Sequence, residues 1–95
     1  MNLEEYYKYY LTLHQNKWCR RLHFLGQWVT LFSLCVMIGY KMNLTAYLIL
    51  PFIIYPFAWS GHFFFEKNKP ASFSDPIKAK ICDWIMFRDI LLGKL

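Results

Sequence analysis

LHFLGQWVTLFSLCVMIGY, residues 22–40, decides the fold, because the stretch contains no Asp, Glu, Lys or Arg. At helical rise its 19 residues span about 28 Å, close to the hydrocarbon thickness of a bilayer. A second uncharged stretch, residues 45–65, carries Pro51, Pro56 and Gly61 and predicts a kinked membrane helix. Only residues 41–44 separate the two, which is short enough to force an antiparallel hairpin.

Composition supports a membrane domain. The 95 residues allow one domain at most, and 57% of them are hydrophobic against 18% charged, which is too apolar for an ordinary soluble domain. Ten of the eleven Lys and Arg flank the outer ends of the hairpin, and only Lys41 lies at its turn. This distribution predicts anionic lipids rather than nucleic acid as partners, and it places both termini in the cytoplasm.

Two amphipathic helices complete the predicted all-α membrane domain, residues 1–95. Residues 3–14 (LEEYYKYYLTLH) carry tyrosines at helical spacing, which suits a membrane interface. Residues 76–92 follow Asp75 and Pro76, a typical helix start, and their charges favour an interfacial helix over a third span. The acidic, aromatic N-terminus is unlike a signal peptide, so we expect the first span to be retained.

The three histidines are the strongest candidates for chemistry. His23 begins the first span and His62 lies near the end of the second, so the hairpin returns both to one membrane face. His14 lies nine residues before His23, which on one straight helix would point the two apart; a break near Asn16 would let them converge. Glu66 follows His62 by four residues and can share its helix face.

Three imidazoles and a carboxylate at one interface suit iron or zinc. The non-functional alternative is that the histidines are hydrated side chains at the membrane interface and that Glu66 is a solvated charge in a loop. Asn16 and Asn68 are more simply helix caps or turn formers than substrate ligands. Arg20 and Arg21 are lipid-facing anchors that could also hold a carboxylate substrate. The cysteines, Cys19, Cys35 and Cys82, are predicted to be reduced structural thiols. Asp83 is by default a charge on a helix surface, with orientation of a histidine as hydrogen-bond acceptor as the alternative.

Three segments resemble a family of small membrane proteins: YYLTLHQNKWCRRLHFLG (9–26), WSGHFFFEKNKPASFSDP (59–76) and DWIMFRDILLGKL (83–95). Fungal members are iron(II)-dependent 2-hydroxy fatty acid dioxygenases of the endoplasmic reticulum. They act in fatty-acid alpha-oxidation and shorten the acid by one carbon. The resemblance therefore implies Fe(2+) as cofactor, dioxygen and a 2-hydroxy fatty acid as substrates, and His14, His23 and His62 as metal ligands. Glu66 belongs to the motif GHxxFExNxP that carries the resemblance, and we expect it to be a catalytic residue beside the three histidines.

The chain departs from the fungal pattern in length and in one histidine. Fungal members have further hydrophobic segments and another histidine between the segments matching 9–26 and 59–76, where this chain has only the short turn 41–44. The chain resembles a compact bacterial branch, which implies the bacterial inner membrane as its location, or the endoplasmic reticulum in a eukaryote. The site could be completed by Glu66, by water or by a second subunit, or its chemistry could be altered. A homodimer would also help two spans to enclose a long acyl chain.

Two other classes of function compete with the enzyme. A small lipid-binding or scaffold protein would carry the same spans with histidines that bind no metal. A minimal transporter is disfavoured, because neither span has a charged residue at mid-membrane.

Overall fold

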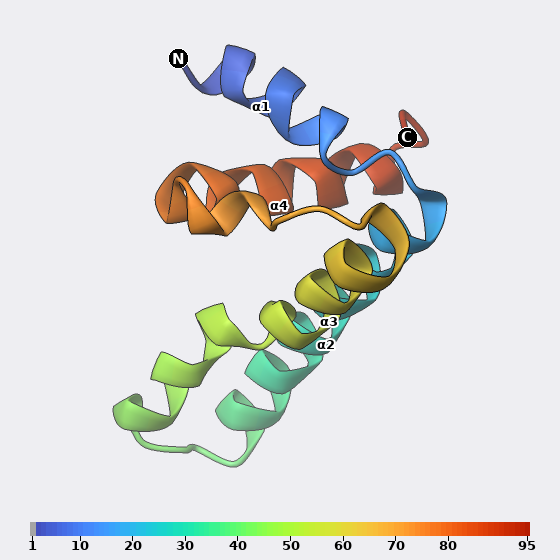
Figure 1. The fold of residues 1–95 in the computed structure, drawn as a ribbon. Helices are drawn as coiled ribbons and strands as arrows, with labels where there is room; N and C mark the ends of the chain where they lie inside the picture. The colour runs from blue at the N-terminus through green and yellow to red at the C-terminus, as the bar shows by residue number, and fades with distance from the viewer. Residues whose placement is uncertain (1) are drawn as a thin grey trace.

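The computed structural model describes residues 2–95, and all regular structure in that range is helical (Figure 1). Two helical stretches, Lys17–Gly39 and Leu44–Glu66, are long and apolar enough to cross a membrane. The elements in chain order are α1 (Leu3–Thr12), α2 (Lys17–Gly39), η1 (Leu44–Phe52), α3 (Ile54–Gly61), η2 (His62–Glu66), η3 (Ala71–Phe73) and α4 (Pro76–Leu91).

Helix α2 begins at Lys17, earlier than the predicted span at 22, because Asn16 caps it. The Asn16 side-chain oxygen accepts a hydrogen bond from the Trp18 N–H at 2.8 Å, which satisfies one of the free donors of the first turn. Helix α1 has already ended at Thr12. The chain therefore turns a corner at residues 13–16, where a break was predicted, and His14 lies in that corner.

The second apolar stretch changes helix type along its length. It begins as the 3₁₀ segment η1, which contains Pro51, continues as α3, and ends as the π-helical turn η2. Proline cannot donate a backbone hydrogen bond, so a regular α-helix is interrupted there. The predicted kink is thus a change of hydrogen-bonding register, and the carbonyl of Pro51 accepts a hydrogen bond from Lys80 of α4.

Two glycines bring α2 and α3 close together. A Cβ on Gly61 would stand 2.9 Å from the Cys19 sulfur and 3.1 Å from the Cys19 Cα, and a Cβ on Gly26 would stand 3.1 Å from Ile54 and Phe57. Figure 1 shows α2 and α3 side by side, running in opposite directions. The close approach at Gly61 is immediately beside His62, so it sets the distance between the helices that carry two of the histidines.

Helices α1 and α4 pack across the end of this pair (Figure 1). The tyrosine face of α1 lies against α4, with Tyr6 and Tyr10 buried there together with Cys82 and Met86. The prediction that this face meets a membrane interface is therefore wrong for Tyr6 and Tyr10, because α4 covers them.

Helix α4 buries two aspartates beside its apolar contacts with α1. Asp75 caps it by accepting from the Lys78 N–H at 3.0 Å, as the sequence predicted. Asp83 and Asp89 are each only 7% exposed, whereas Ile77 is 74% exposed. The expected surface position of Asp83 is thus wrong. The outward face is the apolar one, formed by Ile77, Ile81, Trp84, Leu91 and Leu92.

Candidate metal centre

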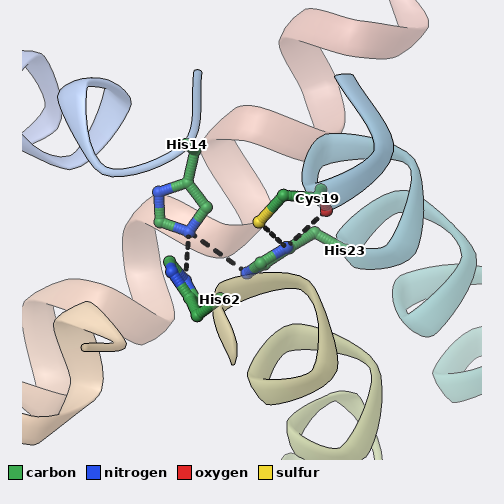
Figure 2. Close-up of side chains that lie close together, drawn as sticks. All are labelled: His14, Cys19, His23 and His62. Atoms are coloured by element: carbon green, nitrogen blue, oxygen red, sulfur yellow. Dashed lines mark hydrogen bonds between the residues drawn. The ribbon is translucent and has the colours of Figure 1, made fainter. Parts of the chain in front are cut away.

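The structure brings His14, His23 and His62 together from three elements. Their Nε2 atoms converge: His14 Nε2 lies 3.1 Å from His23 Nε2 and 2.9 Å from His62 Nε2 (Figure 2). All three side chains are nearly inaccessible, with exposed fractions of 1–2%. Residues from the α1–α2 corner, the first turns of α2 and the start of η2 therefore form one buried cluster.

Each imidazole has its Nδ1 occupied by an acceptor. His14 Nδ1 donates to the Tyr10 carbonyl at 2.7 Å, and His23 Nδ1 donates to the Cys19 carbonyl at 2.8 Å. His62 Nδ1 donates to the Asn68 side-chain oxygen at 2.7 Å. Because carbonyl oxygens only accept, all three rings carry their proton on Nδ1.

This tautomer leaves three Nε2 lone pairs facing one point. Burial, and next the neighbouring His23, lower the pKa of His14 far below its ordinary value, so this ring is neutral at pH 7. No proton is then available for hydrogen bonds among the neutral rings, and three converging lone pairs repel one another. A cation removes that repulsion. A metal with nitrogen bonds of about 2.1 Å fits the short separations, and rings held through Nδ1–H by carbonyl oxygens are typical of metal ligands.

The sequence after His62 folds back to orient its ring. Lys67 adopts the left-handed conformation, with φ 57°, and its N–H bonds to the His62 carbonyl. The N–H of Asn68 also bonds to this carbonyl, at 3.2 Å. The π-helical turn thus brings the Asn68 side chain back to the His62 ring, whose Nδ1–H it accepts. The Asn68 amide is fixed in the right sense because its Nδ2 donates to the Leu13 carbonyl at 3.1 Å.

The corner that carries His14 is held by residues that the sequence had offered as substrate or catalytic candidates. Asn68 binds the Leu13 carbonyl, Arg20 Nε donates to the His14 carbonyl, and the Glu66 carboxylate accepts from the Asn16 N–H. Asn16 itself caps α2. These contacts link residues 13–20 with residues 66–68, and in them Glu66 supports the corner.

Arg21 lies apart from the cluster. Its guanidinium stands 4.7 Å from the centre of the Trp18 ring, on the exposed side of α2. This stacking is typical of a side chain at a surface or a lipid headgroup region.

Cys19 is a neighbour of the centre that the sequence reading had left as a structural thiol. Its sulfur lies within 4.8 Å of a ligand nitrogen of each histidine. Its nearest contact is His23 Nδ1, at 3.7 Å, on the side of the ring away from His14 and His62 (Figure 2). We therefore assign the converging set to the three Nε2 atoms. All three cysteines are free, as predicted.

A second polar pair, Tyr10 of α1 and Asp83 of α4, lies against the same cluster. The histidines share a small cavity of about 10 Å³, enough for one water molecule, with Tyr10 and Asp83. The Tyr10 hydroxyl donates to Asp83, and the Tyr10 ring stacks on His14 with centroids 3.9 Å apart. Burial raises the pKa of Asp83 to about 6, so it can exchange a proton near neutral pH. Orientation of a histidine was the alternative role predicted for Asp83, and here its carboxylate accepts from Tyr10 instead. The signal that could have found Tyr10 was its position four residues before His14.

Fold and site together define an all-helical protein with a buried three-histidine cluster suited to a metal ion. Over residues 1–95 the chain matches the family described as 2-hydroxy-palmitic acid dioxygenase Mpo1-like, and it belongs to that family. The resemblance drawn from the sequence motifs is thereby confirmed. The family name implies a dioxygenase, and with it a metal cofactor and a 2-hydroxy fatty acid substrate. No curated protein and no solved structure matches the chain.

Proposed function

We propose that this chain is a membrane-bound, iron(II)-dependent dioxygenase of 2-hydroxy fatty acids, with His14, His23 and His62 as the iron ligands. The observation that carries the proposal is the convergence of three Nε2 lone pairs at 2.9 and 3.1 Å, on rings whose Nδ1 protons are all donated elsewhere. Neutral imidazole is a good ligand for ferrous iron, and three ligands leave positions open for substrate.

The membrane placement rests on the surface of the two long helices. Only 22% of each apolar window is buried within the protein, unlike the core helix of a soluble domain. Large side chains such as Phe32, Leu48 and Phe64 are 69–73% exposed, and lipid is the cover that suits them. We place α2 and the stretch 44–66 as a transmembrane hairpin. The apolar outer face of α4 then lies in the interface, and both termini are cytoplasmic.

The overall reaction balances without a further reductant. A 2-hydroxy fatty acid and one dioxygen give the acid one carbon shorter, carbon dioxide and water, with dioxygen taking up four electrons. Ferrous iron, when bound, supplies dioxygen activation and a place for the substrate oxygens. The histidines hold the ion, and their Nδ1 partners keep the rings fixed.

Two further groups of the chain act on protons and water. Breaking the C1–C2 bond requires the 2-hydroxyl proton to leave, and Asp83, with Tyr10 donating to it, is the acceptor that lines the histidine cavity. The cavity holds about one water molecule, so the site is nearly dry before substrate binds. Glu66 acts at a distance, by holding Asn16 and hence the His14 corner.

Metal analysis and turnover test the proposal together. Protein purified anaerobically in detergent should contain one iron per chain and convert 2-hydroxypalmitate to pentadecanoate in the presence of dioxygen. His62→Ala should lose both the iron and the product, whereas Cys35→Ser, a change at an exposed thiol outside the site, should keep both. Wild-type protein without iron, or full activity in His62→Ala, would contradict the proposal and favour a non-enzymatic lipid-binding or scaffold role. A homodimer stays a prediction, for which mass measurement in detergent is the check.

A further inference from the structure

A second cavity lies one helical turn from the histidines and has no part in holding the ion. It has a volume of about 300 Å³, within the range of small-ligand pockets, and lies between α2, α4 and the junction of η1 with α3. Its lining is largely apolar, with Leu31, Leu34, Leu50, Ile54 and Trp84. A hydrocarbon chain is the ligand that such a lining favours.

One end of this cavity is polar, and a donor there has no partner. Gln27 lines the cavity and is 2% exposed, yet its Nε2 makes no hydrogen bond within residues 2–95. Leaving a buried amide N–H unpaired is costly, so this donor requires a partner that the described residues do not supply. Gln27 lies four residues after His23, on the same buried face of α2 and about 6 Å further along the helix.

A cation stands at the same cavity. Lys80 lines it, and its ammonium donates to the Pro51 carbonyl and lies 4.5 Å from the centre of the Tyr55 ring. An ammonium has three donors, so others remain for a ligand oxygen. Tyr55 also lines the histidine cavity, which places Lys80 between the two cavities. Arg20 and Arg21 are engaged elsewhere, with the His14 carbonyl and the Trp18 ring.

We propose that this cavity is the acyl subsite of the substrate: the Gln27 amide and the Lys80 ammonium bind the carboxylate, and the chain beyond C2 lies among Leu31, Leu34 and Leu50. The inference rests on the proposed function for the identity of the ligand. It commits to the substrate's own chain as occupant, since a phospholipid tail has no oxygen to bring to Gln27 at this depth. A carboxylate held here keeps C1 and C2 at the histidine end of the chain.

Binding to the metal-free protein tests the subsite apart from the chemistry. Leu34→Trp fills the cavity, so it should weaken binding of 2-hydroxypalmitate about tenfold or more while leaving 2-hydroxyhexanoate nearly unchanged. Leu48→Trp, at a position 69% exposed and outside the cavity, is the matched control and should change neither. Equal effects of Leu34→Trp on both acids, or no effect on either, would overturn the assignment of the chain.

Gln27→Met separates a ligand-binding role from a structural one. Removing an unpaired buried donor should raise the unfolding midpoint of the ligand-free protein by a few degrees. The same change should weaken 2-hydroxypalmitate binding about tenfold. Lys80→Met should also weaken binding, and Lys94→Met, at the exposed C-terminus, should not. Unchanged affinity in Gln27→Met contradicts the proposal.

A photoreactive 2-hydroxy fatty acid, with its diazirine near the end of the chain, locates the ligand directly. Labelling within residues 27–34 supports the subsite if unlabelled 2-hydroxypalmitate prevents it. If protein labelled in this way binds no iron, the subsite stands and only the dioxygenase proposal fails. Labelling confined to lipid-facing positions in protein that binds iron and turns over overturns the subsite alone. Displacement of the label by phospholipid but not by 2-hydroxypalmitate identifies a lipid pocket and also overturns it.

Discussion

The two ends of the apolar helix pair are built in opposite ways. At the histidine end, His14, His23 and His62 are buried, and each ring has a fixed hydrogen-bond partner. At the turn end, η1 has no buried residue, and Leu44 is 85% exposed. The protein packs tightly on itself only where it positions chemistry, and it leaves the turn end to its surroundings.

This difference has a physical basis in a chain of 95 residues. So short a chain buries too little surface to pack both ends tightly. In a bilayer the lipid covers apolar side chains, so exposed leucines at the turn cost little there. Buried histidines and carboxylates have no such cover and need protein partners. Matched substitutions at the two ends should therefore have unequal effects.

The largest expected effect on stability is at Asp83. Its pKa is raised from 3.8 to about 6, with burial as the main cause, so the folded state binds its proton more tightly than the unfolded state. Stability from this group is full below pH 3.8 and is lost as the pH rises through 6. Asp83→Asn should remove that loss and raise stability at pH 7 by up to about 3 kcal/mol, an advantage that fades towards pH 4.

Unfolding in detergent between pH 4 and pH 8, followed by circular dichroism, measures this prediction. Lys41→Gln, an exposed change at the turn, is the control and should leave the pH profile unaltered. The groups facing Asp83 are the Tyr10 hydroxyl, which an Asn oxygen can still accept from, and the Lys80 ammonium. Parallel pH profiles for wild type and Asp83→Asn would contradict a raised pKa at this position.

A smaller effect is expected from adding one methyl group at a glycine of each end. Gly61→Ala puts a Cβ 2.9 Å from the Cys19 sulfur and 3.1 Å from its Cα, so α2 and α3 must separate. We expect a loss of about 2 kcal/mol and weaker metal binding, because His62 moves with Gly61. At the turn end a Cβ on Gly39 meets nothing within 4 Å, and Gly39→Ala should be neutral or stabilising by up to about 1 kcal/mol.

Chemical unfolding compares the stability of the Gly61→Ala and Gly39→Ala variants, and their iron content is measured in parallel. Equal stability of the two variants would show that the close approach at Gly61 is not a constraint.

The sequence was sufficient for features set by local patterns. Charge-free runs predicted two apolar helical stretches, and Asn16 and Asp75 predicted helix starts that the structure confirms. The convergence of His14 with His23 could be predicted, because it depends only on a local helix break near Asn16 that lets residues nine positions apart face each other.

Features that depend on contacts across the chain were beyond the sequence. Asp83 and the exposed isoleucines Ile77 and Ile81 lie on different faces of α4, but the pattern does not say which face packs against protein and which is left exposed. The role of Asn68 depends on a left-handed Lys67 and a π-helical turn, for which no residue type is a reliable signal. Cys19 packs against Gly61 of α3, a contact between residues far apart in the sequence that no local pattern predicts.

The smallest effect we predict compares two asparagines. Asn68 accepts from the His62 Nδ1–H, so Asn68→Ala frees the ring and should lower iron affinity about tenfold, with little loss of helix. Asn43 caps η1 through the Ala46 N–H at 3.2 Å, and Asn43→Ala should cost about 1 kcal/mol of stability without changing iron affinity. Competition with a fluorescent chelator measures the affinity. Asn68→Asp keeps the acceptor and should restore most of the iron binding, whereas a merely structural Asn68 would not be rescued by Asp, because the Leu13 carbonyl then loses its donor.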